Sequence, residues 1–227
     1  NLKKKLRAAE SSTADQQEWL VLRFPLLSSV LIILCTFQFI FPKPPFGLTS
    51  TLWIISVLSL TIIFWNFITK YWRNAWLILL LMFFPAVFDN MILQASRAER
   101  YGMLLLSLMG VIFGVVYLSS PRRKELKEKG VLIFIAFVVL MELISTVANL
   151  YGRFNLSKSF LTGGIFGLVN GILFLWVIRL INEMLTIAAG IYRNPGRNTL
   201  YINFETVSKK ARPVFYYLLV VGWFILF

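Results

Sequence analysis

Residues 160–192 read FLTGGIFGLVNGILFLWVIRLINEMLTIAAGIY, and this apolar stretch decides the fold. Gly163, Gly167 and Gly171 recur four residues apart, so on a helix they form one groove without side chains. Small residues at this spacing let a second helix approach closely, which is typical of helix association in lipid. At about 1.5 Å per residue the stretch would run roughly 50 Å, more than the ~30 Å of a hydrocarbon core. We therefore expect a transmembrane helix whose last turns emerge at the membrane surface.

The composition of the whole chain points to the same environment. Hydrophobic residues make up 58% of the chain, Phe alone occurs 21 times, and the mean hydropathy is +0.75. Six apolar runs of about 20 residues and a shorter seventh exceed what a soluble domain contains. The sequence therefore predicts an all-α polytopic membrane protein with about seven transmembrane helices.

The predicted segments follow one another with short connections. They lie at about 24–41, 48–69, 75–95, 101–118, 131–151 and 160–192, and the last begins at 213. This divides the chain into a basic tail (1–18), a six-helix bundle (19–192), a basic linker that could lie along the surface (193–212) and a seventh helix (213–227). Because the chain starts at Asn1 and stops within an apolar run, we expect a piece of a longer protein.

The net charge of +13 predicts a membrane partner and not a nucleic acid, because Lys and Arg lie between the apolar runs. Anionic lipid head groups lie at that depth. Sixteen Lys and Arg residues fall on one side of the predicted membrane and five on the other, while Arg23 and Arg179 lie within segments. The positive-inside rule then places the N-terminus in the cytoplasm.

Two predicted segments carry polar stripes, and polar groups inside a bilayer need a reason because they are costly there. On segment 131–151 the stripe comprises Glu142, Ser145, Thr146 and Asn149. On segment 75–95 it comprises Asp89, Asn90 and Gln94, and Asn90, Gln94 and Arg97 share a face. The two stripes could face each other, with Arg97 or Arg153 neutralising an acid. They indicate either an ion or proton pathway with Asp89 and Glu142 as carriers, or a packing cluster or outward-facing notch.

Further candidates lie on the other helices. Gly110 and Gly114 form a second pair of small residues, and Asn170 is expected to bond to a neighbouring helix from the glycine face. Arg179 and Glu183 are four residues apart and can pair. They either extend to the head groups or couple the membrane to the 193–212 linker.

The loop 119–130 is the most charged of the chain. Its five basic residues fix the topology or bind anionic lipid head groups; they are Arg122, Arg123, Lys124, Lys127 and Lys129.

Enzymatic chemistry is not expected. The chain has no His, no glycine-rich phosphate loop, no HExxH and no CxxC. Its single cysteine, Cys35, cannot form an intrachain disulfide, and a zinc site would need several Cys or His ligands. We interpret Cys35 as a packing residue and expect no catalytic residue, cofactor, metal or small-molecule substrate.

The helix at 160–192, the linker RNTLYINFETVSKKAR (197–212) and PVFYYLLVVGWFILF (213–227) resemble large, multi-helix members of the small-conductance mechanosensitive channel family. In that family an inward helix, a basic connection and an outward helix precede the pore-lining helix. The resemblance implies that this chain is the lipid-facing sensor portion, and that it passes tension through Arg179, Glu183 and the linker to a pore beyond residue 227. It also implies a homo-oligomer in the bacterial inner membrane.

Two other functions fit the residues. An accessory or transporter subunit of a membrane complex would depend on Asp89 and Glu142. A structural membrane scaffold would instead depend on Gly163, Gly167 and Gly171.

Overall fold

The computed structural model describes residues 19–37, 40, 44–65, 67–92, 96–125, 130–191, 214, 217 and 220–223. Over these ranges the protein is all-α, as predicted. Its elements in chain order are α2 (Leu20–Arg23), α3 (Pro25–Phe37), α4 (Phe46–Trp65), α5 (Lys70–Met91), α6 (Arg97–Ser119), the 3₁₀ helix η1 (Pro121–Glu125), α7 (Gly130–Leu150) and α8 (Phe154–Ile191).

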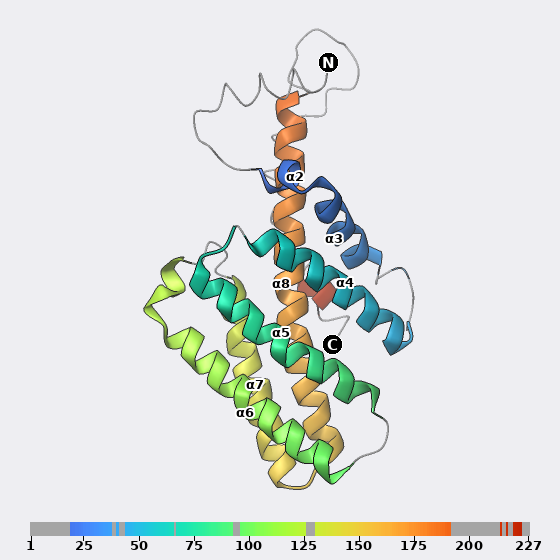
Figure 1. Ribbon diagram of the computed structural model, residues 1–227, viewed down its shortest axis with the longest axis vertical. Coiled ribbons are helices and arrows are strands. Elements are labelled where there is room, and N and C mark those ends of the chain that lie inside the picture. The colour runs from blue at the N-terminus through green and yellow to red at the C-terminus, as the bar shows by residue number, and fades with distance from the viewer. Residues whose placement is uncertain are drawn as a thin grey trace.

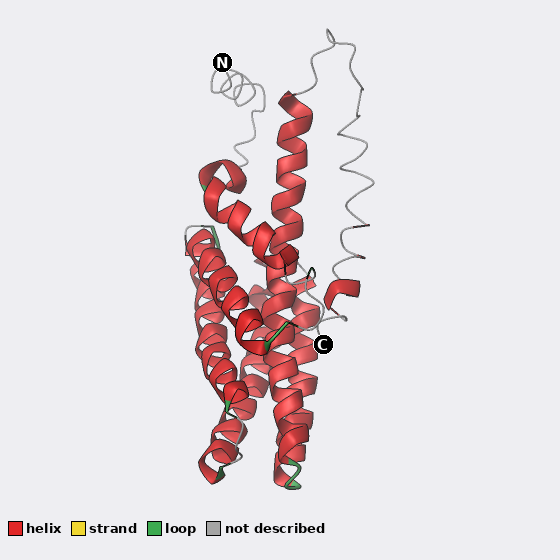
Figure 2. Ribbon diagram, turned by 90° about the vertical axis from the view of Figure 1, so that its right-hand side faces the viewer, coloured by secondary structure: helices red, strands yellow, loops and turns green. Residues whose placement is uncertain are grey.

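Helix α8 is the axis around which the other helices are arranged (Figure 1). It has 38 residues, and nearly all of its side chains between 161 and 180 are buried. A helix that is apolar all round is stable only when neighbours cover it on every side or when it lies in lipid. In the side view, α8 extends past the level at which the lower bundle ends, and α3 lies beside its upper part (Figure 2).

Aromatic side chains fix the crossing helices against this axis. Phe166 of α8 lies 6.1 Å from Phe46 and 5.1 Å from Trp53 of α4, between ring centroids, and 5.7 Å from Phe83 of α5. Offset and edge-on ring pairs at such distances stabilise beyond the area that they bury. Helices α4 and α5 therefore cross α8 at one shared aromatic cluster, while α7 runs along α8 and α6 packs on α7.

Among the described residues, five helices are long and apolar enough to span a membrane, and about seven were expected over the whole chain; the five are α4, α5, α6, α7 and α8. The predicted first segment, 24–41, is an apolar helix of only 13 residues, α3. At about 1.5 Å per residue α3 is about 20 Å long, shorter than a hydrocarbon core. The predicted linker 193–212 lies outside the described residues, as does most of the predicted seventh helix.

The turn between α7 and α8 is tighter than expected. Residues 152–158 were predicted as a connection, but α8 already begins at Phe154. Gly152 has a φ of 75°, and the amides of Gly152 and Arg153 donate to the carbonyls of Asn149 and Ala148. A glycine in the left-handed conformation with these two bonds closes a helix and reverses the chain within a few residues.

The ends of α5 and α6 change the predicted polar face of residues 90–97. Helix α5 ends at Met91, and α6 begins at Arg97 behind a capping box. In that box the Ser96 hydroxyl accepts from the Glu99 amide and the Glu99 carboxylate accepts from the Ser96 amide. The prediction that Asn90, Gln94 and Arg97 share one helix face was therefore wrong, because Arg97 belongs to the next helix. Gln94 lies outside the described residues.

Candidate functional site

The ends of α5, α6 and α8 meet at one lysine. The Lys158 ammonium lies 2.8 Å from Glu99 Oε1 and 3.7 Å from Asp89 Oδ2. It also donates to the backbone carbonyls of Asp89 at 2.6 Å and Ile92 at 3.0 Å. Sequence reasoning singled out Asp89 but missed both Glu99 and Lys158. Lys158 had been assigned to a connection, although it lies in the first turns of α8.

A second polar contact joins α6 to the end of α7. Arg100 donates from Nε to Asn149 Oδ1 at 3.1 Å and from its terminal nitrogen to the Asn149 carbonyl at 2.9 Å. The Asn149 amide in turn donates to the Arg100 carbonyl at 3.2 Å. Both the oxygen and the nitrogen of the Asn149 side chain, and its backbone carbonyl, therefore bond to Arg100.

The rest of the α7 stripe is divided between two neighbours. The Ser145 hydroxyl donates to the Ser157 carbonyl of α8 at 2.9 Å. The Thr146 hydroxyl bonds to Ser107 of α6 at 3.0 Å and to the Glu142 carbonyl within α7. These contacts bear out the interpretation of the stripe as an interhelical hydrogen-bond cluster for three of its members, Ser145, Thr146 and Asn149.

Glu142, the fourth member, has a different environment. Its side chain is completely buried, and neither carboxyl oxygen has a hydrogen-bond partner. It lies against Gly110 of α6 and Gly164 of α8. The structure thus does not bring Glu142 to Asp89, whose carboxylate lies 3.7 Å from the Lys158 ammonium where the ends of α5, α6 and α8 meet. The half-buried Asn90 lies next to Asp89.

The glycines mark where the helices approach most closely. A Cβ atom added at Gly110 would lie 2.7 Å from Glu142 Cγ, and one at Gly171 would lie 2.6 Å from the Phe134 ring. One added at Gly114 would collide with a Val139 methyl group of α7. At Gly167 the neighbours are Phe137 and Trp223, whose indole nitrogen donates to the Gly167 carbonyl at 2.9 Å. These four glycines make helix contacts as predicted.

Gly163 does not, because a Cβ atom there would meet nothing within 4 Å. The adjacent Gly164, which the spacing of four does not include, makes the contact with α7 instead. Asn170 also differs from expectation. Its amide nitrogen donates to the Phe166 carbonyl of its own helix, and its oxygen is buried without a partner.

Arg179 and Glu183 pair as the spacing predicted, with 3.3 Å between Nε and Oε1. Both side chains are mostly covered. They therefore do not extend to the head groups, which was one of the two interpretations. Arg179 stacks over the rings of Phe67 and Trp176, while Glu183 Oε2 accepts from the amide of Leu20 at 3.0 Å. The pair therefore ties α8 to the start of α2. Its predicted contact with the 193–212 linker lies outside the described residues.

Removing this acceptor should loosen α2 locally. Replacing Glu183 with alanine is expected to destabilise the start of α2 by about 1 kcal/mol, since that is the typical worth of an acceptor for free helix amides. Amide hydrogen exchange at Leu20 and Val21 should then be several times faster. Glu183→Gln retains an acceptor oxygen and should show a smaller change. Equal exchange in all three proteins would contradict the capping role.

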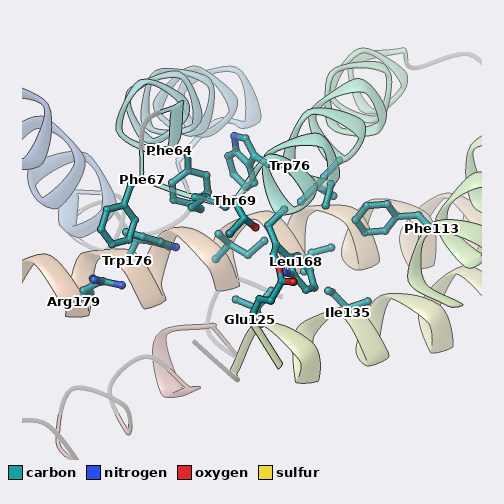
Figure 3. A pocket seen from close by; sticks show the side chains of 16 residues that line it. Phe64, Phe67, Thr69, Trp76, Phe113, Glu125, Ile135, Leu168, Trp176 and Arg179 are labelled. Carbon is teal, nitrogen blue, oxygen red and sulfur yellow. The ribbon is translucent and has the colours of Figure 1, made fainter. Parts of the chain in front are cut away.

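A cavity of about 120 Å³ lies between the ends of α4 and α5 and the facing sides of α6, α7 and α8 (Figure 3). Aromatic and aliphatic side chains form most of its lining, and Phe67 and Trp176 lie next to Arg179 at one end. Its few polar members are Thr69, Glu125 and Arg179. Such a lining suits an apolar group better than a polar substrate.

The basic loop borders this cavity. In η1, residues Arg122, Arg123 and Lys124 are exposed, and the Arg122 guanidinium lies over the Tyr71 ring at 5.1 Å. Lys127 and Lys129 lie outside the described residues.

Within the described ranges, no three acidic, Cys or His side chains gather as metal ligands would. No family model matches the chain, and neither the curated proteins nor the solved structures contain a match. The function must therefore be inferred from the geometry. Its main features are the buried central helix α8 and the charged cluster around Lys158 at one end of the bundle. Glu142 is buried in the bundle without a hydrogen-bond partner, and the Arg179–Glu183 pair lies toward the other end of α8.

Proposed function

We propose that this chain is the membrane-embedded, lipid-facing sensor of a mechanosensitive ion channel, passing bilayer tension to a pore in the same assembly. The proposal includes a homo-oligomer in the bacterial inner membrane and no enzymatic activity. The observation that carries it is the enclosure of α8 by helices with apolar outer faces, together with the tie between α8 and α2. Arg122, Arg123 and Lys124 would hold anionic head groups on the cytoplasmic side.

The outer helices offer apolar side chains to lipid. Large apolar side chains on the outward faces of α5, α6 and α7 are more than half exposed; they include Leu81, Phe88, Leu105, Ile112 and Ile133. Exposed apolar area of this extent is stable in lipid and not in water. Tension therefore acts first on α5, α6 and α7, and α8 receives it through them.

The close contacts with α8 favour movement of whole helices along one another over local rearrangement of side chains. At Gly167 and Gly171 of α8 the backbone itself approaches a neighbouring side chain, and Gly114 of α6 approaches Val139 of α7 in the same way. The backbone of each glycine therefore has no side chain of its own to absorb a displacement. Tension favours the state that occupies more membrane area, and it shifts the population by the free-energy difference between the states. Tilting of the outer helices along these contacts would change the area and move α8, with Arg179 and Glu183 at its far end.

A reversible cross-link between α6 and α7 tests the proposal. A Cβ atom at position 114 lies 3.6 Å from the Val139 Cβ, within the range that a disulfide spans, about 3.5–4.5 Å. The pair Gly114→Cys and Val139→Cys also removes the Val139 methyl that obstructs a side chain at 114. In a Cys35→Ser background, patch-clamp recordings of the full-length protein should show stretch-activated currents. The tension threshold should rise on oxidation and return on reduction.

Each single-cysteine variant serves as a control and should not respond to oxidant. Absence of stretch-activated current from the unsubstituted full-length protein would refute the channel proposal. An unchanged threshold with the disulfide formed would refute movement between α6 and α7 as the sensing step.

A further inference from the structure

Glu142 lies in a space made for it by two other helices. It is near the middle of α7 and is completely buried. A Cβ atom at Gly110 of α6 would lie 2.7 Å from its Cγ, and one at Gly164 of α8 would lie 3.0 Å from its Oε1. The Met82 methyl of α5 lies on the same side of Gly110. Glycine at both positions therefore admits the carboxyl group to a junction of three helices.

No charge in the described residues compensates this carboxyl group. Glu142 is the only titratable residue of α7, and neither of its oxygens has a hydrogen-bond partner. The charged groups of the adjoining helices lie toward the helix ends and face elsewhere. Asp89 of α5 and Glu99 of α6 bind Lys158 of α8, and Arg100 of α6 binds Asn149. Arg179 and Glu183 pair with each other on the far part of α8.

A buried carboxylate without a partner costs several kcal/mol, whereas the neutral acid costs far less. The packed arrangement of α6, α7 and α8 therefore requires the protonated form. If the proton leaves, the charge can be hydrated only when α7 separates from Gly110 or Gly164 and admits water. Proton release and helix separation are thus linked, and by reciprocity any force that separates the helices also promotes proton release.

We propose that Glu142 is a proton-binding site that holds α6, α7 and α8 together while the proton is bound. The packed state binds one proton more than the separated state does. Its stability is therefore fully present at low pH and is lost as the pH rises. This inference stands on the geometry of Glu142 and does not depend on the tension-sensing role.

The first test is the protonation state of the unsubstituted chain in lipid nanodiscs. Infrared spectra at neutral pH should contain the carbonyl stretch of a protonated carboxylic acid, and ¹³C-labelling of glutamate should shift that band. Because the experiment needs no substitution, it cannot be lost to misfolding. Absence of a shifted acid band at neutral pH would overturn the proposal.

The second test measures the separation. Spin labels at Leu105→Cys and Leu143→Cys, both exposed, report the α6–α7 distance in a Cys35→Ser background. In the otherwise unsubstituted protein the distance should lengthen by several ångströms between about pH 6 and about pH 10, a range in which ordinary carboxyl groups are already ionised. Glu142→Gln keeps the shape but cannot ionise, so its distance should stay constant.

The exposed acid Glu125 provides the matched control, and Glu125→Gln should respond to pH like the parent. A distance that does not change with pH in the parent would overturn the proposal. So would an equal lengthening in Glu142→Gln, because the responsible group would then lie elsewhere.

Discussion

Replacing Lys158 with methionine is expected to lower the free energy of unfolding by about 3–5 kcal/mol, the usual cost of removing one partner of a buried ion pair. Lys158 neutralises Glu99, whose side chain is 3% exposed, and lies near Asp89, whose side chain is 13% exposed. Methionine fills a similar volume but leaves both carboxylates and two backbone carbonyls without the ammonium. Thermal unfolding of the purified protein in detergent, followed by circular dichroism, should show the loss.

Two variants make this result specific. Lys124→Met changes an exposed lysine of η1 and should leave the unfolding midpoint unchanged. The double variant Lys158→Met with Glu99→Gln removes the ammonium together with the more deeply buried carboxylate. It should therefore recover part of the lost free energy of unfolding. If Lys158→Met unfolds like Lys124→Met, the cluster contributes nothing to stability. If the double variant is worse than the single variant, the loss does not come from an unpaired charge.

The sequence was sufficient for the helices and insufficient for this cluster, and the reason is physical. Apolar runs report local burial, so five spanning helices could be predicted from composition and length. Lys158 lies 59 residues from Glu99 and 69 from Asp89 in the sequence, and no periodicity connects it to them. They meet only because α8 begins earlier than its apolar run suggested and because a capping box orients Glu99 at the start of α6. The first helix was predicted at the right place but too long, since an apolar run sets a maximum length and does not say where the helix ends.

The sequence predicts the polar stripe of α7, but it does not predict which residues the stripe contacts. Helical spacing alone places Glu142, Ser145 and Asn149 on one side of a helix. Which helices cover that side depends on the order in which they pack around α8. Ser145 therefore bonds to α8, Asn149 bonds to α6, and Glu142 is left between the two. The expectation that the stripe faces Asp89 failed because α8 and α6 occupy the positions next to α7.

The glycine face of α8 shows that a strict spacing of four residues departs from the helical period of 3.6 and selects the wrong glycine. An α-helix turns about 100° per residue, so eight residues separate Gly163 from Gly171 by about 80° around the axis. Seven residues bring Gly164 to within about 20° of Gly171. The face that contacts α7 therefore follows Gly164, Gly167 and Gly171, and a strict spacing of four drifts away from it. Gly163 and Gly164 are neighbours in the chain but have opposite surroundings.

This contrast leads to the second prediction. Gly171→Ala should lower the free energy of unfolding by about 1–3 kcal/mol, because the added methyl meets the Phe134 ring at 2.6–2.7 Å. The ring belongs to α7 and is packed against Trp223 at 5.7 Å, so it cannot turn away freely. Gly163→Ala adds the same methyl to the same helix in open space. It should be neutral, or stabilising by up to about 1 kcal/mol, since alanine favours the helix over glycine.

The comparison is best made on unfolding midpoints of both variants in the same detergent, because helix propensity then cancels and only the contact differs. A smaller side chain at position 134 should relieve the collision. The double variant Phe134→Leu with Gly171→Ala should therefore lose less free energy of unfolding than the two single variants added together. Equal midpoints for Gly163→Ala and Gly171→Ala would mean that α7 and α8 are not in backbone contact at this position. The close approach of α7 to the central helix, through which tension would have to pass, would then be absent at Gly171.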